Sequence, residues 1–339
     1  MTSKHREDLV NIRAIAIMLV ALGHSIIIYS STWNLYQTSV QAPVLDHLKN
    51  IVNMLQMPLF FSVSGFCLVF TLLRGGEGRL EARAFIRNKC SRILLPFLII
   101  GFLWLLPIRF ALNYPNYRNL PLWKVVLKEC LWGSDNGHLW FLPTLFLMFM
   151  LTLVLITICG TGARLDIVMA VIGVIALGLY GTARQTVSWN TYLLQFSNYY
   201  LFFALGFIYH RNERLLHKQL RHTTVPIIPK PLAAIVLAGA MAAAWFKPAT
   251  PILLLCSCLS VLAVYIITPQ HSTPFMRFIS KDSMGIYLFH SPMLYISFTF
   301  WPDINPLLMI LINFIGFGSI AIGMTELMRH LHLGFIIGE

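Results

Sequence analysis

Two side chains that are costly to place in a membrane stand in one apolar run near the start of the chain. Arg13 and His24 belong to the stretch NIRAIAIMLVALGHS, residues 11–25. Ionisable residues inside membrane helices are rare and usually functional. Neutral imidazole acts near pH 7 as a general base or as a nucleophile. We therefore treat His24 as a candidate for proton transfer or acyl transfer, and Arg13 as a group that holds or polarises the reacting molecule.

The spacing of Arg13 and His24 places both on one face of a helix. Eleven residues separate them, which corresponds to about 1100° of rotation, within roughly 20° of whole turns, and to about 16 Å along the axis. On this interpretation the two side chains line one polar cavity. The alternative is that Arg13 extends to the lipid headgroups while His24 bonds a neighbouring helix.

A second polar stripe lies in SMGIYLFH, residues 283–290. Ser283, Tyr287 and His290 fall at i, i+4 and i+7 of this apolar segment, which is one face of a helix. The stripe is predicted to face the interior of a helix bundle. There it forms either a hydrogen-bonded seam between helices or part of a catalytic or binding site.

A third candidate group follows the turn-like residues SDNG at 134–137. His138 is predicted to stand at the outer end of a helix, with Trp140 at the depth of the membrane interface. Tryptophan is common at that depth in any membrane protein. The functional alternative is that Trp140 forms a platform on which a sugar ring stacks.

Composition indicates which elements position these residues. The chain has 339 residues, of which 57% are hydrophobic and 11% charged, and its mean hydropathy is +0.72. Soluble domains carry roughly 25% charged residues. The apolar runs are long and continuous rather than alternating, which excludes a β-barrel and leaves helices to satisfy the backbone in lipid. We predict an all-α polytopic membrane bundle, a single domain over residues 1–339, with membrane lipids around it.

A span length of about 20 residues predicts about ten transmembrane helices. They are placed at 9–30, 51–73, 92–112, 138–158, 165–182, 191–209, 231–246, 250–268, 283–300 and 305–325. The six cysteines are scattered and lack metal-ligand spacing, so no metal site is expected.

Basic residues predict the orientation of these spans. With both termini cytoplasmic, 17 of the 25 Lys and Arg fall in inward segments. Arg13 lies inside the first span, and the outward segments hold seven, namely Lys49, Arg109, Arg118, Lys124, Lys128, Arg184 and Lys247. This asymmetry predicts cytoplasmic termini and explains the net charge of +12 without a nucleic acid. The inward cluster between Arg74 and Arg92 is denser than orientation requires and is a candidate anion site.

Five stretches in order along the chain resemble the acyltransferase 3 family. They are the Arg13/His24 pattern, MPLFFSVSGF at 57–66, KCSRILLP at 89–96, HLWFLPTL at 138–145 and SMGIYLFH at 283–290. The second stretch reads equally well as close helix packing through small residues. In the third, Lys89 stands where the family's basic motif has arginine, so the charge is kept but one planar fork is lost.

The resemblance implies an integral membrane O-acyltransferase. Such an enzyme moves an acyl group, usually acetyl, from cytoplasmic acyl-CoA to a sugar hydroxyl of a cell-envelope polysaccharide or a lipid-linked precursor. It implies acetyl-CoA as the donor and the bacterial inner (plasma) membrane as the location, with no metal. The implied roles are catalytic for His24 and Arg13, acyl-CoA-binding for Arg87, Lys89 and Arg92, and acceptor-binding for His138, Trp140, Tyr287 and His290.

Two other functions fit a charge-sparse helical bundle. A proton-coupled small-molecule transporter would also carry intramembrane histidine and arginine, but the chain shows no repeated halves and few Asp or Glu within the spans. A non-catalytic membrane scaffold would leave the Arg13/His24 spacing without a purpose. Binding of acetyl-CoA separates both from an acyltransferase.

Overall fold

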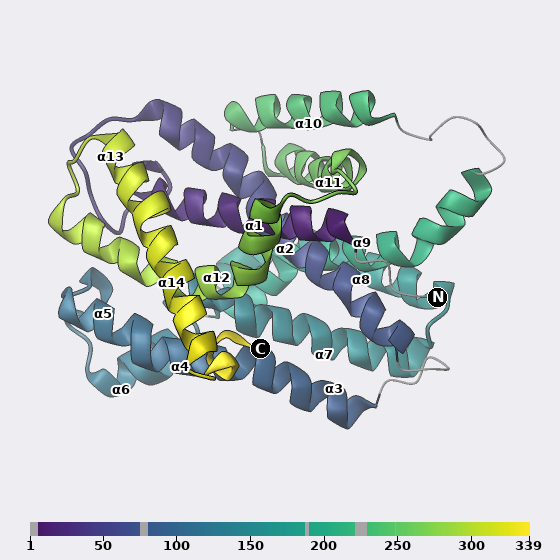
Figure 1. The fold of residues 1–339 in the computed structure, drawn as a ribbon, viewed down its shortest axis with the longest axis horizontal. Helices are drawn as coiled ribbons and strands as arrows, with labels where there is room; N and C mark the ends of the chain where they lie inside the picture. The colour runs from purple at the N-terminus through teal and green to yellow at the C-terminus, as the bar shows by residue number, and fades with distance from the viewer. Residues whose placement is uncertain (1–5, 75–80, 187–189, 221–228, 248) are drawn as a thin grey trace.

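Helices make up the regular structure of the chain wherever it is described. The computed structural model describes residues 6–74, 81–186, 190–220, 229–247 and 249–339. Within these ranges there is no strand, and long helices cross one another in a bundle (Figure 1). The all-α class predicted from the sequence is confirmed.

Seven of the described helical segments are long and apolar enough to cross a membrane. They are Glu7–Ser25 (α1), Pro43–Leu72 within α2 (Pro43–Arg74), Ala82–Ala111 (α3 to α5), Gly137–Cys159 (η6 and α7), Ala163–Thr182 within α8 (Ala163–Thr186), Thr250–Ile267 (α11) and Pro306–His330 (α13 to α14). Three further helices are shorter or more polar: α9 (Thr191–Leu220), α10 (Lys230–Trp245) and α12 (Pro274–Phe300). Every predicted span coincides with a helix, whereas a total of about ten crossings stays a prediction.

Prolines account for irregular turns in the helical segment 82–111. Pro96 and Pro107 each lack an N–H and crowd the carbonyl four residues earlier. A π-helical turn precedes each proline and widens the helix there. The segment therefore runs as α3 (Ala82–Lys89), η2 (Cys90–Leu94), α4 (Leu95–Ile100), η3 (Gly101–Leu105) and α5 (Leu106–Ala111).

Short helical turns complete the connections. They are η1 (Ile27–Tyr29), η4 (Pro115–Tyr117), α6 (Leu122–Lys124), η5 (Val125–Leu131) and η8 (Gly334–Ile337). Two of the spans named above are divided in the same way as 82–111, one into η6 (Gly137–Trp140) and α7 (Phe141–Cys159), the other into α13 (Pro306–Ile310), η7 (Leu311–Gly316) and α14 (Phe317–His330). In Figure 1, α5, α6 and α13 lie at the left of the molecule, while α3 lies at the lower right.

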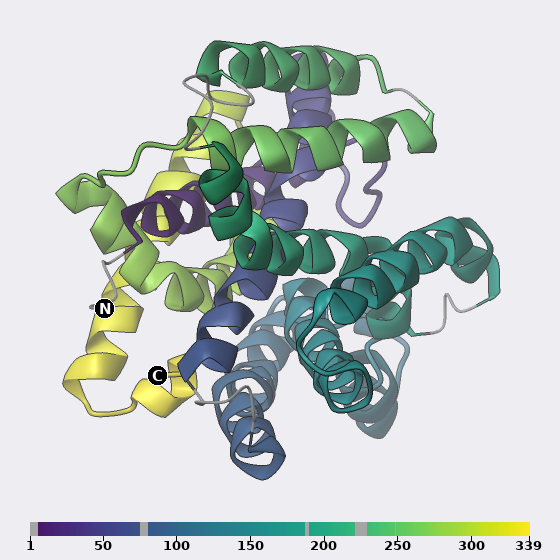
Figure 2. The same cartoon turned by 90° about the vertical axis from the view of Figure 1, so that its right-hand side faces the viewer.

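Helix α2 packs closely against α9 through glycine. A side chain at Gly65 would collide with the backbone carbonyl of Phe203, and one at Gly206 would collide with that of Ser62. The small residues of MPLFFSVSGF therefore serve helix packing here, one of the two interpretations of that motif. On the other side α1 lies between α2 and α12, and α10 and α11 stack together at one edge of the molecule (Figure 2).

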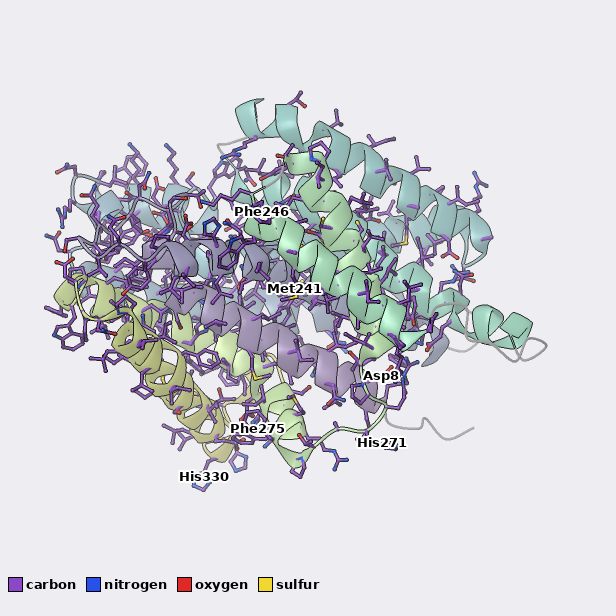
Figure 3. The ribbon with its side chains drawn as sticks, turned by 90° about the horizontal axis from the view of Figure 1, so that it is seen from above. Asp8, Met241, Phe246, His271, Phe275 and His330 are labelled. Atoms are coloured by element: carbon purple, nitrogen blue, oxygen red, sulfur yellow. The ribbon has the colours of Figure 1, made fainter. Side chains whose placement is uncertain are left out.

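The start of α1 is tied to the segment that leads into α12. Nδ2 of Asn11 donates to the carbonyls of Pro269 and His271, both at 3.0 Å. Glu7 accepts from Ser272 and pairs with Arg277 at 2.9 Å. Figure 3 shows Asp8 and His271 near each other at this end. These bonds fix the relative position of α1 and α12, the two helices that carry the histidines described next.

Candidate functional site

His24 on α1 and His290 on α12 contact each other inside the bundle. Nδ1 of His24 lies 3.0 Å from Nε2 of His290. The two rings stack with their centroids 5.2 Å apart, and His290 has no exposed surface. The fold thus joins two histidines that the sequence separates by 266 positions.

A second contact of His290 determines where the protons of this pair lie. Its Nδ1 is 2.5 Å from the carbonyl oxygen of Ile286, and because a carbonyl only accepts, that nitrogen carries the proton. In the neutral ring Nε2 is then an acceptor, and Nδ1–H of His24 donates to it. Neutral His24 therefore has its lone pair at Nε2, where it can take up a proton or attack a carbonyl carbon.

A third histidine joins the site because of a proline in α12. Pro292 has no N–H, so the carbonyl of Leu288 lacks its helical partner. Nε2 of His138 lies 3.2 Å from that oxygen and donates to it. Nδ1 of His138 is then an acceptor, and it is buried without a hydrogen-bond partner among the described residues. A hydroxyl group of a ligand would satisfy this nitrogen.

Two cavities meet at these histidines. Each has a volume of about 210 Å³. The first is also lined by polar side chains of α2, and the second by the segment before η6 and by α12. The residues that line both cavities are His24, Ile27, Trp33, His138 and Trp140.

Most of the residues predicted to bind an acceptor gather in these walls. The Trp140 ring stacks on Tyr199 at a centroid distance of 5.8 Å. The Tyr287 hydroxyl donates to the backbone carbonyl of His138 at 2.5 Å, which fixes the histidine's backbone, and Tyr287 also lines the first cavity. Three of the four predicted acceptor residues, His138, Trp140 and Tyr287, thus line the first cavity. His290 lies behind His24 and is not among the residues that line either cavity.

Arg13 lies elsewhere on α1. Its side chain is exposed, and it is not among the residues that line either cavity. Because α1 is one continuous helix, Arg13 remains about 16 Å from His24 along the axis. The structure therefore separates the two residues that the sequence suggested as partners in one cavity, although both remain on a single helix.

The predicted acyl-CoA residues lie on α3 and η2. Arg87 is exposed, and Nζ of Lys89 lies 3.8 Å from the centroid of the Phe149 ring. Nε of Arg92 donates to the carbonyl of Gly338 at 2.8 Å, so this arginine also holds the C-terminal segment. Of the wider basic cluster, Arg79 lies outside the described residues.

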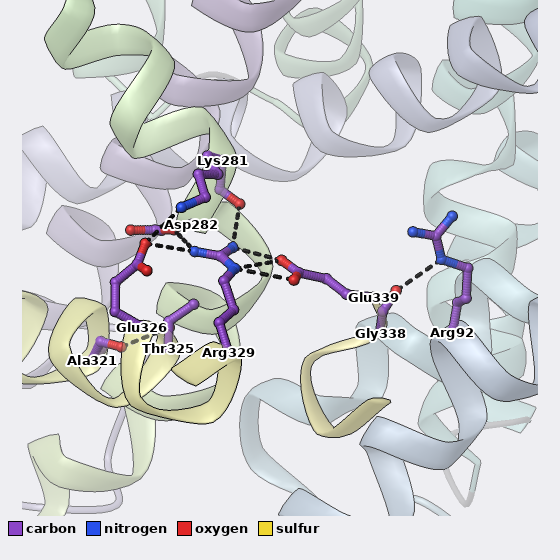
Figure 4. Close-up of polar contacts among 9 residues, drawn as sticks. All are labelled: Arg92, Lys281, Asp282, Ala321, Thr325, Glu326, Arg329, Gly338 and Glu339. Carbon is purple, nitrogen blue, oxygen red and sulfur yellow. Dashed lines mark hydrogen bonds and ion pairs between the residues drawn. The ribbon is translucent and has the colours of Figure 1, made fainter. Parts of the chain in front are cut away.

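An ion-pair network anchors the same C-terminal segment (Figure 4). Arg329 contacts Asp282 on α12, Glu326 on its own helix, and Glu339 at 2.6 Å. Lys281 pairs with Glu326 at 2.9 Å. The network positions Gly338 against Arg92. This contact occupies Nε of Arg92, and its two terminal nitrogens have no partner among the described residues.

Comparison with known proteins identifies the family. A family model described as an acyltransferase domain matches residues 7–325. The chain belongs to the acyltransferase 3 family. No match to it is found among curated proteins or among solved structures. Family membership confirms the resemblance that the five sequence stretches indicated, and with the apolar helices it makes the chain a multi-pass membrane acyltransferase.

From the sequence, one residue of this candidate site is assigned only to the orientation of the spans. Arg109 on α5 is completely buried and lines the second cavity. Its guanidinium donates to the hydroxyls of Tyr117 at 2.6 Å and Tyr295 at 2.7 Å, and it pairs with Asp135 at 3.2 Å. A lone arginine inside an apolar run was the available signal, the same signal that drew attention to Arg13.

Tyrosines complete the surroundings of Arg109. Burial raises the pKa of the Tyr114 and Tyr117 phenols, which belong to the segment after α5. Both hydroxyls therefore keep their protons and donate to Asp135, Tyr114 to its carboxylate and Tyr117 to its backbone carbonyl. The Tyr114 ring also lies 4.0 Å from the guanidinium carbon of Arg109. This cluster holds the wall of the second cavity in place.

From the sequence, Lys49 on α2 is likewise assigned only to the orientation of the spans. It is 3% exposed and lines the first cavity beside His24. The neighbouring Gly23 permits this close approach of α2, because a Cβ there would collide with Oε1 of Gln56 and would lie 2.8 Å from Val52 and 3.1 Å from Nζ of Lys49. The glycine before the histidine thus lets α2 bring a lysine to the site.

No cysteine is among the residues that line the two cavities. All six cysteines are free. Over the described ranges, no group of three or more His, Cys, Asp or Glu is arranged to hold a metal ion. The polar groups that line the two cavities are imidazole, ammonium, guanidinium, amide, hydroxyl and, in the second cavity, the carboxylate of Asp135.

Proposed function

We propose that this protein is an integral membrane O-acyltransferase that moves an acyl group, usually acetyl, from cytoplasmic acyl-CoA to a sugar hydroxyl. The acceptor belongs to a cell-envelope polysaccharide or a lipid-linked precursor. One observation carries the proposal. The contacts of His290 leave the lone pair of His24 at Nε2, where two cavities lined by aromatic and polar side chains meet.

The proposed transfer begins with proton removal by His24. As the sugar oxygen attacks the thioester carbonyl, Nε2 takes the hydroxyl proton, and a tetrahedral intermediate forms. The C–S bond then breaks, and the proton passes from His24 to the CoA sulfur. Throughout, Nδ1–H of His24 stays bonded to His290, which orients the ring and stabilises its protonated form. Alternatively, Nε2 attacks the thioester carbonyl and CoA leaves as its thiolate. The sugar oxygen then attacks the acyl group on His24, the C–N bond breaks, and the hydroxyl proton passes to the thiolate.

The donor is proposed to approach from the cytoplasmic side. Arg87, Lys89 and Arg92 would bind the nucleotide end of acyl-CoA through its phosphates, since phosphate oxygens attract guanidinium and ammonium groups. Arg13 would contact the extended arm of the donor along α1. This arrangement suits a polyanion whose reactive thioester must reach a base deeper in the membrane.

The acceptor is proposed to enter the cavities from the outer side. Trp33 and Trp140 line both cavities and provide flat apolar surfaces for a sugar ring, while Nδ1 of His138 would accept a sugar hydroxyl. The protein would then lie in the bacterial plasma membrane with both termini in the cytoplasm, consistent with the distribution of basic residues.

Transfer of label tests this function. Purified protein in proteoliposomes is given acetyl-CoA with a radioactive acetyl group and de-acetylated envelope glycans from cells that carry the gene. We expect label in an alkali-labile ester on the glycan, and loss of that ester from the glycans of cells lacking the gene. Passage of a solute without any acyl transfer would instead indicate a transporter.

A further inference from the structure

The first cavity contains a buried cation without a counter-charge. Lys49 is 3% exposed, and within the described chain no carboxylate forms an ion pair with it. The residues that line this cavity include no Asp or Glu. An isolated ammonium in such surroundings is unfavourable unless it releases its proton or gains an anion.

The other cations near the outer end of the site have partners. Arg109 in the second cavity pairs with Asp135 at 3.2 Å, and Lys247 pairs with Asp46 at 2.7 Å. Both cations are neutralised where they stand. Lys49 differs from them because the space in front of its ammonium is a cavity rather than a carboxylate, so the cavity is where a counter-charge would bind.

An amide on α2 adds a second donor to this wall. Asn53 and Gln56 follow Lys49 at i+4 and i+7, on the same helix face, and both line the cavity. Nε2 of Gln56 donates to Oδ1 of Asn53 at 2.9 Å. This bond uses the oxygen of Asn53 and leaves its Nδ2, one turn from Lys49, as a donor without a partner among the described residues. Oε1 of Gln56 is a buried acceptor that likewise has no partner there. An ammonium and an amide N–H₂ at this spacing suit an anionic oxygen pair.

We propose that this cavity binds an anionic group of the acceptor, a carboxylate or a phosphate, through Lys49 and Asn53. The acceptor is then an acidic sugar, or a sugar attached to phosphate, rather than a neutral one. This inference rests on the proposed acyl transfer to a sugar. The anion positions the acceptor so that one of its hydroxyls lies at His24, which lines the same cavity.

Chemical editing of the acceptor tests this proposal. De-acetylated envelope glycan fragments are divided into three samples. One is left untreated, one has its carboxylates reduced to alcohols, and one has its phosphates removed. We expect wild-type protein to acylate the untreated sample and to lose about tenfold or more in kcat/KM on one edited sample, because a charge-assisted hydrogen bond contributes that much. The sample that loses activity identifies carboxylate or phosphate.

Substitutions of Lys49 connect that loss to the cavity. Lys49→Met should lower kcat/KM on the untreated sample to the level of the edited one. Lys49→Arg should keep part of the difference in kcat/KM between the two samples. Lys128→Met, at an exposed outward lysine, should keep all of it. Acyl-CoA binding and thermal unfolding verify that each variant is folded.

Three results would overturn the inference. Equal wild-type activity on all samples would show that no anion is recognised, while leaving acyl transfer intact. If Lys49→Met lowers kcat/KM equally on all three samples, Lys49 acts on the donor or on the transition state rather than on an anion of the acceptor. Absence of transfer to any sample by the wild type would remove the proposed function, and this inference with it.

Discussion

Nε2 of His290 accepts the hydrogen bond of His24 Nδ1–H at 3.0 Å, and it does so because its own Nδ1–H is committed to the Ile286 carbonyl. The relationship resembles that of a catalytic base held by a second group, but here the second group is a neutral imidazole rather than a carboxylate. His290 lines neither cavity, so we expect it to position His24 rather than to contact the acceptor, the role that the sequence predicted for it.

Replacing His290 should impair transfer without impairing donor binding. His290→Leu removes the acceptor for His24 Nδ1–H, so the ring loses its fixed orientation. We expect kcat to fall by about 10²-fold, within the range that a positioned base contributes. His290→Gln offers an amide oxygen to the same N–H and should retain more activity. Single-turnover transfer and acyl-CoA binding are measured for both variants.

The comparison of these two variants is the control for packing. A His290→Leu protein with nearly normal kcat would remove His290 from the positioning of His24. If His290→Gln and His290→Leu are equally inactive and both unfold at the wild-type temperature, a hydrogen-bond acceptor at position 290 is not sufficient for activity. That result would contradict the proposed hydrogen bond from His24 to His290.

Among the basic residues of the segments predicted to face outward, we expect Arg109 to contribute most to stability. Its substitution by Met leaves Asp135 and two tyrosine hydroxyls without their partner. Removing one member of a buried pair costs about 3–5 kcal/mol, whereas Arg118→Met, at an exposed site, should stay within about 0.5 kcal/mol. Unfolding in detergent, followed by denaturant or heat, measures both. Similar small losses for the two variants would show that the Arg109 cluster does not hold the fold.

The basic residues on α3 and η2 should determine acyl-CoA affinity. Arg87→Ala or Lys89→Ala removes a charge-assisted contact and should weaken binding by about tenfold or more. Arg92 is less suitable for this test because it also holds Gly338. Arg164→Ala, at an exposed arginine at the start of α8, is the control and should bind normally. Unchanged affinity in the Arg87 and Lys89 variants would move the donor site elsewhere.

The orientation of the chain is testable by labelling from each side. Ala84 and Asn119 are both exposed, one on α3 and the other in the segment after α5. In a protein whose six native cysteines are replaced, an impermeant maleimide should reach Asn119→Cys in intact cells and Ala84→Cys only after the membrane is opened. Labelling of both residues from the same side would contradict the predicted topology, which rests on the excess of inward basic residues.

Much of the site could be predicted from the sequence because its residues break an apolar background. His24, His138, Trp140, Tyr287 and His290 each stand out in a hydrophobic run or in a family motif, and the fold brings all five together. Helical periodicity predicted which side of each helix faces inward. Which pairs of residues touch depends on helix packing, so the contact between His24 and His290 could not be predicted.

Arg109, Lys49 and Arg13 show where this reasoning fails. All three are basic residues in or near apolar runs, and the sequence gives each the same signal. Arg109 is buried because Asp135 and Tyr295, which lie 26 and 186 positions away, receive its N–H groups. Lys49 is buried because Gly23 admits it, and Arg13 is exposed because α1 presents it on an open surface. Tertiary contacts decide whether each of these side chains is buried or exposed, and these contacts cannot be predicted from residue spacing along a single helix.

The central claim is that Nε2 of His24 performs the transfer step, and single-turnover acyl transfer tests it most directly. Labelled acetyl-CoA and glycan acceptor are mixed with excess protein, and acyl-CoA binding is measured separately. His24→Ala and His24→Gln should both bind the donor normally, because most of its contacts lie elsewhere, and should transfer at least about 10²- to 10⁴-fold more slowly, since both lack a base. Near-normal transfer by folded His24→Ala protein would contradict the account and would leave His138, with its unpartnered Nδ1, as the next candidate.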